Sequence, residues 1–128
     1  MPNLLCVTHE WELETEEMRQ LEGSGFRVVR ATNGFDAIKH FATGDIDAVV
    51  VNRRLPDISI ADLAAYFRHH KSLPIVMVST FMPVRNVPSA VDAVIGKPDC
   101  GSLLAATLQV LLKETPAQRD GDTFARVA

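Results

Sequence analysis

The chain has 128 residues, the usual size of one domain, and 47% of them are hydrophobic, which is enough for a single core. Lysine and arginine total 13 against 16 aspartate and glutamate. This acidic balance argues against nucleic-acid binding, which normally needs a basic excess. Two cysteines, Cys6 and Cys100, are too few for a disulfide scaffold. No apolar run approaches the roughly 20 residues of a membrane span, and no signal peptide is visible. We therefore expect a cytoplasmic protein with no membrane partner.

Five short apolar runs are the predicted β-strands. The runs at 4–7, 48–51 and 75–78 are nearly continuous, which is typical of strands buried on both faces of a parallel sheet. The runs at 27–31 and 91–95 also carry polar residues, so we expect these two strands nearer the edges of the sheet. Cys6 lies inside the first run and is expected to be a small buried hydrophobic residue.

Helical spacing of apolar residues separates most of these runs. It predicts helices over 12–23, 35–43, 59 to about 70, and 102–114. Ser59 and Asp62 resemble a capping box that opens the third of these helices.

The connection between the fourth and fifth strands has a different composition. Pro83 and Pro88 fall within residues 81–90, and two prolines in ten residues argue against a regular helix there. A helix at this place is expected to be shortened or missing. Residues 115–128 show little apolar periodicity and are predicted to be a flexible tail after a domain of residues 1–114.

Strands that alternate with helices predict an α/β fold with a doubly wound parallel sheet. In such a sheet the functional crevice lies beyond the carboxyl ends of the strands. The polar residues expected at these ends are Thr8, His9, Glu10, Asn52, Ser79 and Lys97.

These residues, in this order, resemble the receiver domain of bacterial response regulators, the CheY-like superfamily, over residues 3 to about 114. The segment 47–57 reads DAVVVNRRLPD, 74–80 reads PIVMVST and 96–98 reads GKP. In the family these places hold the phosphoacceptor strand, the fourth strand with its terminal Ser or Thr, and a lysine followed by proline. The resemblance implies a flavodoxin-like five-stranded sheet of order 2-1-3-4-5 with helices on both faces. It also implies a part in two-component signalling or a phosphorelay.

The resemblance also implies three carboxylates that this chain does not have. In receivers, two acids after the first strand bind Mg²⁺, and an aspartate after the third strand binds the metal and accepts the phosphoryl group. Here Thr8 and His9 stand at the acidic pair, and Glu10 is the one acid left in that run. Asn52 stands at the acceptor position, and a neutral amide is neither a good nucleophile nor an anionic ligand.

The other receiver positions are partly retained. Ser79 and Lys97 are of the type that contacts a phosphoryl group, whereas Val94 stands where receivers usually carry a switch Tyr or Phe. We interpret the chain as a pseudo-receiver that is not an enzyme, has lost Mg²⁺ binding and acts by protein–protein interaction. The alternative is a small-ligand or anion sensor that uses the crevice at the strand ends. A phosphoacceptor at some other residue is the least favoured hypothesis.

Two surfaces are candidate interfaces. Trp11, Glu12 and Glu14 begin an acidic region that could dock a histidine kinase, a phosphotransfer domain or another regulator, although a solvated acidic face explains them equally well. The last predicted helix is apolar almost all round, so the face that it forms with the fifth strand could support a homodimer. His9 alone does not indicate a metal site, because Zn²⁺ normally needs four ligands.

Overall fold

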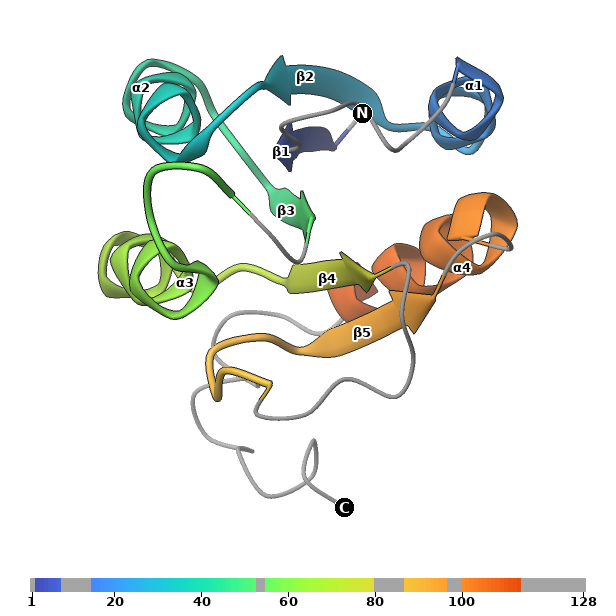
Figure 1. Cartoon of the computed structure of the whole chain (residues 1–128). Helices are drawn as coiled ribbons and strands as arrows, with labels where there is room; N and C mark the ends of the chain where they lie inside the picture. The colour runs from blue at the N-terminus through green and yellow to red at the C-terminus, as the bar shows by residue number, and fades with distance from the viewer. Residues whose placement is uncertain (1, 8–14, 53–54, 80–86, 97–99, 114–128) are drawn as a thin grey trace.

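The computed structural model describes residues 2–7, 15–52, 55–79, 87–96 and 100–113 (Figure 1). Its sheet consists of β1 (Asn3–Val7), β2 (Arg27–Ala31), β3 (Ala48–Asn52), β4 (Ile75–Ser79) and β5 (Ala93–Gly96). The helices of the described part are α1 (Thr15–Gly23), α2 (Gly34–Thr43), α3 (Ile60–His70) and α4 (Cys100–Lys113). All strand pairs are parallel, and the order is β2-β1-β3-β4-β5. The predicted fold class and strand order are confirmed.

Helices cover both faces of this sheet, with α2 and α3 on one side and α1 and α4 on the other (Figure 1). The core is therefore divided into two layers by the sheet. One layer packs Leu21 of α1 and Leu104 and Leu108 of α4 against the strands. The other layer packs Ala37 of α2 and Phe67 of α3 against the opposite face. Below, we call the second layer the α2/α3 core.

The burial of each strand follows its place in the sheet. Every residue of β3 and β4 is buried, and so are four of the five residues of β1, because these strands have neighbours on both sides and helices on both faces. The edge strands β2 and β5 are more exposed. The continuous apolar runs thus mark the interior strands, as predicted.

Local signals fix the helix ends. Asn33 caps α2 by accepting a hydrogen bond from the backbone N–H of Asp36 at 2.8 Å, and Ser59 caps α3 in the same way through Asp62 at 3.1 Å. After α1, Gly25 has a φ of +99°. The N–H of Phe26 reaches back to the carbonyl of Leu21 at 3.2 Å, the closing bond of a Schellman motif. Phe26 and Leu21 are both buried, so this turn also directs the chain into β2.

The connection between β4 and β5 is helix-free in its described part. Residues 87–92 contain a turn in which the Val91 N–H donates to the carbonyl of Pro88 at 3.0 Å. Residues 80–86 lie outside the described residues, as does the tail at 114–128. The strand β5 begins at Ala93 and not at Val91, and Asp92, the residue before it, is bonded to Ile75 at the start of β4. Within the described ranges, no helix is long and apolar enough to cross a membrane.

The carboxyl edge of the sheet as a candidate functional site

Asn52 and Ser79 lie side by side at the carboxyl edge of the sheet. Asn52 is the last residue of β3 and pairs with Val78, and Ser79 is the next residue of β4. Ser79 in turn pairs with Gly96 of β5. Both polar side chains are buried, and both make interactions with other groups. The sequence therefore placed these two candidate residues correctly at neighbouring strand ends.

The other predicted crevice residues lie outside the described residues. These are Thr8, His9, Glu10, Trp11, Glu12, Glu14 and Lys97. In sequence, Thr8 follows Val7, which pairs with Val51 of β3, and Lys97 follows Gly96, which pairs with Ser79. Thr8 thus comes directly after β1, which pairs with the strand that ends in Asn52. Lys97 comes directly after β5, which pairs with the strand that ends in Ser79.

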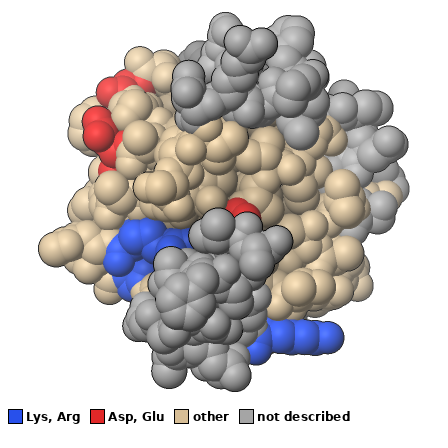
Figure 2. All heavy atoms as spheres, turned by 90° about the horizontal axis from the view of Figure 1, so that it is seen from below, with Lys and Arg blue, Asp and Glu red and all other residues tan. Residues whose placement is uncertain are grey.

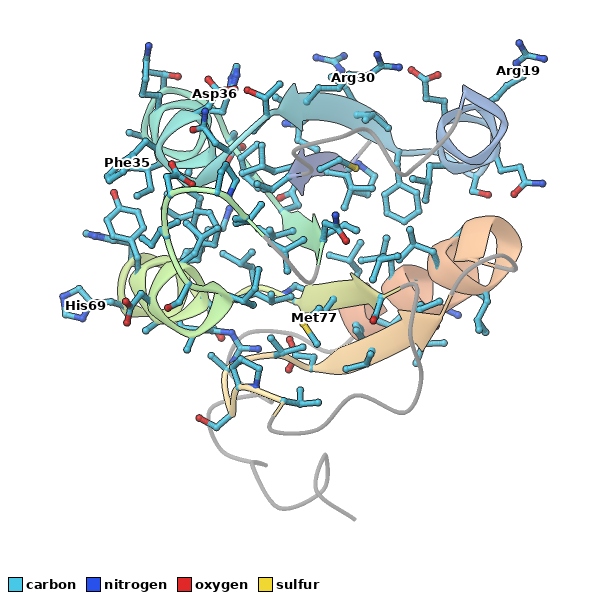
Figure 3. The ribbon with its side chains drawn as sticks, in the orientation of Figure 1. Arg19, Arg30, Phe35, Asp36, His69 and Met77 are labelled. Atoms are coloured by element: carbon cyan, nitrogen blue, oxygen red, sulfur yellow. The ribbon has the colours of Figure 1, made fainter. Side chains whose placement is uncertain are left out.

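Val94, the predicted switch-aromatic position, lies in the middle of β5. It pairs with Met77 of β4 and is half-buried against the α2/α3 core. Figure 3 labels Met77 on β4, and its side chain is buried in the α2/α3 core. Valine has no ring that could move between a buried and an exposed state. As a β-branched residue in a strand it also has few rotamers.

Asp57 has a role that the sequence did not reveal. Its Oδ1 accepts a hydrogen bond from the N–H of Gly34 and its Oδ2 accepts one from the N–H of Phe35, both at 2.9 Å. The carboxylate thus occupies the N-terminus of α2, where unpaired N–H groups favour negative charge. Desolvation by burial acts to raise the pKa of Asp57, but the bonds from Phe35 and Gly34 outweigh it and lower the pKa. Gly34 and Asp57 are 23 positions apart, so no local pattern links them.

An ion pair between Arg68 and Asp92 was also not predicted. Arg68 is in the last turn of α3, and Asp92 immediately precedes β5. The Asp92 carboxylate also accepts the N–H of Ile75 at 2.8 Å, and its own N–H donates to the Ile75 carbonyl at 2.7 Å. Asp92 therefore fixes the beginning of β5 to the beginning of β4 and to α3.

The described polar residues at the carboxyl edge, Asn52 and Ser79, offer Mg²⁺ no carboxylate. This ion prefers oxygen ligands and is usually held through one or two carboxylates. The candidate groups are the amide of Asn52, the hydroxyls of Thr8 and Ser79, the imidazole of His9 and the single carboxylate of Glu10. Asn52, buried at the end of β3, brings no negative charge to this set. Among the described residues, no group of three or more His, Cys, Asp or Glu side chains is placed to hold a metal ion.

Comparison with solved structures identifies the fold. The response regulator TrrA from Thermotoga maritima, solved in complex with Mg²⁺-BeF, is 25% identical with a TM-score of 0.76 over 87% of this chain and 99% of that chain. A CheY-like receiver domain from Methylobacillus flagellatus is 26% identical, with a TM-score of 0.74 over 87% and 98%. The fold is that of CheY-like receiver domains.

A third receiver structure supports the fold with lower sequence similarity. A two-component response regulator from Clostridium difficile is 20% identical, with a TM-score of 0.78 over 88% of this chain and 97% of that chain. No protein-family model matches the chain. The receiver fold is thus shared with these structures at low sequence identity, and the structural neighbours support a two-component signalling module.

Proposed function

We propose that this protein is a pseudo-receiver, a signalling module of a two-component system or phosphorelay that acts by protein–protein contact and without aspartyl phosphorylation. The observation that carries the proposal is Asn52, a neutral amide that lies buried at the end of β3 where a receiver places its acceptor carboxylate. The protein is accordingly not an enzyme and does not depend on Mg²⁺.

The physical argument rests on charge. Phosphoryl transfer to a receiver needs an anionic nucleophile and a metal ion that offsets charge on the transferring group. An amide at position 52 supplies no anion, and Thr8 and His9 replace the acids that would hold the metal. A buried amide also avoids the cost of burying an unpaired carboxylate. An amide at this position therefore needs no metal ion to offset a charge.

Intact-mass spectrometry after treatment with acetyl phosphate and Mg²⁺ tests this proposal. The wild-type chain is expected to gain no phosphate, and TrrA treated in parallel provides a receiver for comparison. An added phosphate on the wild-type chain, at any residue, would overturn the proposal. Titration of the untreated protein with phosphate or sulfate, followed by thermal shift, separates the pseudo-receiver from the anion-sensor alternative, which requires stabilisation by the anion.

For the partner we propose a histidine kinase, a phosphotransfer domain or another regulator that docks on the region of Trp11, Glu12 and Glu14. A pull-down from the native host with the wild type is compared with Trp11→Ala and with Glu12→Lys/Glu14→Lys. The control is Glu22→Lys, which reverses an exposed charge at the end of α1. Loss of a two-component partner in the first two variants, with retention in the control, is the expected result. Equal capture by all four proteins would place the interface elsewhere.

We further propose that a second copy of the chain binds the face of β5 and α4. Leu103 and Val110 of α4 are 52% and 61% exposed and lie seven positions apart, close to two helical turns, so they share one side of the helix. Seen from below, the described surface is mostly uncharged, with basic side chains in separate patches and acidic ones at the upper left and near the centre (Figure 2). A surface with few charges is compatible with a two-fold interface, in which the same patch of both subunits is in contact.

Sedimentation velocity over a wide concentration range measures this association. The variants Leu103→Glu and Val110→Glu are expected to be monomeric at concentrations where the wild type is dimeric. Phe35→Glu is a matched control, since Phe35 is similarly exposed but lies on α2, on the opposite face of the sheet. A wild type that stays monomeric at all concentrations would contradict the homodimer.

A further inference from the structure

The strand β2 is an edge strand with an open outer side. It is the outermost strand of the described sheet, and β1 is its neighbour on the inner side. Figure 1 shows α1 and α2 on the two faces of the sheet beside β2, and no described element beyond its outer edge. The outer edge of such a strand presents backbone N–H and C=O groups to which a further strand can bind.

The residues whose backbone faces this outer edge are Val28 and Arg30. Arg27 donates its N–H to the carbonyl of Pro2 at 2.8 Å, so the backbone of Arg27 faces inward, toward β1. In a parallel pair, every second residue of a strand bonds to the same neighbour, and Val29 therefore faces inward as well. The N–H and C=O groups of Val28 and Arg30 point outward, in position to extend the ladder.

Two arginines flank the outer edge. Arg27 and Arg30 are the exposed residues of β2, and because they are three positions apart, their side chains leave opposite faces of the sheet. Val28, on the face of Arg30, packs with α1 and α4, whereas Val29, on the face of Arg27, packs against the α2/α3 core. Figure 3 shows Arg30 on the outer side of β2 and Arg19 of α1 pointing to the same side of the molecule. Arg30 also interacts within the molecule, so only its exposure and charge enter the argument.

These charges disfavour a second copy of the chain at the same edge. In a two-fold antiparallel pairing of β2 with itself, outward residues have to lie opposite outward residues. Arg30 opposite Arg30 puts like charges directly across from each other, and Arg30 opposite Val28 puts the two Arg30 side chains at diagonal positions. Val28 opposite Val28 puts the two Arg27 side chains at diagonal positions. Every register thus brings like charges within reach of each other, which is destabilising.

We propose that the outer edge of β2 binds an extended segment of a partner protein by strand addition, and that this segment carries two carboxylates, three positions apart, opposite Arg27 and Arg30. Backbone hydrogen bonds to Val28 and Arg30 supply affinity, and the two cross-strand charge pairs select acidic segments over neutral ones. The proposal uses none of the residues of the acidic region at 11–14, and it holds whether or not the protein accepts a phosphoryl group.

Fluorescence anisotropy of the labelled peptide TVEVTEVT measures this binding to the full chain at physiological ionic strength. The neutral peptide TVQVTQVT is expected to bind about tenfold more weakly, and Arg27→Glu/Arg30→Glu is expected to weaken binding of the acidic peptide about tenfold. The milder Arg27→Gln/Arg30→Gln, which adds no repulsion, is expected to weaken it about threefold.

A matched control reverses two charges elsewhere. Lys39→Glu/Lys113→Glu changes the net charge by the same amount at exposed sites of α2 and α4, and salt screens such distant charges, so we expect a change of less than about twofold. Circular dichroism checks that each variant is folded. Absence of peptide binding to the wild type, or equal weakening in the control and in Arg27→Glu/Arg30→Glu, would overturn the proposal.

Backbone methylation of the peptide separates strand addition from attraction between charges alone. N-methyl groups at the third and fifth positions of the peptide, or at the fourth and sixth, leave its charge unchanged but block opposite edges of its backbone. We expect one of these two peptides to lose binding and the other to retain it, because only one edge of an added strand faces β2. Equal weakening of both would contradict strand addition. Self-association of the wild type that disappears in Arg27→Glu/Arg30→Glu would assign the edge to a second copy instead and also contradict the proposal.

Discussion

Arg68 and Asp92 form an ion pair that joins the last turn of α3 to the residue before β5. The Asp92 side chain is only 3% exposed, and its carboxylate also accepts the N–H of Ile75. A buried carboxylate that loses its partner is left with an uncompensated charge. A single substitution in this pair is therefore expected to weaken the α3–β4–β5 side of the molecule.

Replacing Arg68 by Met is predicted to lower the free energy of unfolding by about 2–3 kcal/mol. This is below the cost for a wholly buried pair because Arg68 keeps partial contact with water. Urea denaturation measures the change. Lys71→Met is the control, since Lys71 pairs with the exposed Asp45 and donates to the Ile46 carbonyl, and the loss of these exchangeable bonds is expected to be about 1 kcal/mol. Similar losses in both variants would mean that the Arg68–Asp92 pair contributes no more to the free energy of unfolding than the bonds of Lys71.

Gly34→Ala is predicted to destabilise the protein by about 1–3 kcal/mol, because the new methyl group would overlap with Ile58. The backbone at this position is an ordinary helical one, so the cost comes from the clash. A double-mutant cycle with Ile58→Ala measures it: the double variant should lose less stability than the sum of the two single variants. Additive losses would show that the new methyl group does not clash with the Ile58 side chain.

The lowered pKa of Asp57 predicts a pH dependence. Because the folded-state pKa lies below the ordinary value of 3.8, the folded state favours the ionised form. The resulting stabilisation is complete above that value and is lost as the pH falls through the lowered pKa. Asp57→Asn should therefore show a shallower loss of stability than the wild type in this acidic range, measured by urea titrations. Parallel curves for the two proteins would show that Asp57 does not contribute.

The thiol of Cys6 is predicted to be inert in the native state. Burial raises its pKa to about 12, although the charge of Arg30 acts in the opposite direction. The thiolate is the reactive form, so at pH 8 almost none is present. In Cys100→Ser, labelling of Cys6 should occur only at the rate of global unfolding and should reach completion in urea. Rapid labelling without denaturant would contradict this.

The sequence predicts the fold well because the signals for it are local or periodic. Continuous apolar runs identified β1, β3 and β4, and side-chain caps at Ser59 marked the start of α3. The position of Asn52 and Ser79 followed from the rule that parallel strands present their carboxyl ends at one edge.

The roles of Asp57 and Asp92 were not predictable in this way. Each binds groups 17 or more positions away along the chain, and which aspartate meets which N–H depends on how helices pack on the sheet. An aspartate in a loop is also common for purely local reasons, such as a turn. Sequence patterns therefore placed Asn52 and Ser79 at neighbouring strand ends but did not give the contacts that hold the adjoining segments.

The opposite end of the sheet has a practical consequence for handling the protein. The Asn3 N–H donates to Asp47 at 2.8 Å, and the carbonyl of Pro2 accepts the N–H of Arg27 at 2.8 Å. These bonds hold residues 2 and 3 at the amino ends of the strands. Asn52 and Ser79 are at the other end of the same parallel strands. An affinity tag or a surface linker joined ahead of residue 2 would tether the molecule with the ends of β3 and β4 facing away from the support, free for binding assays.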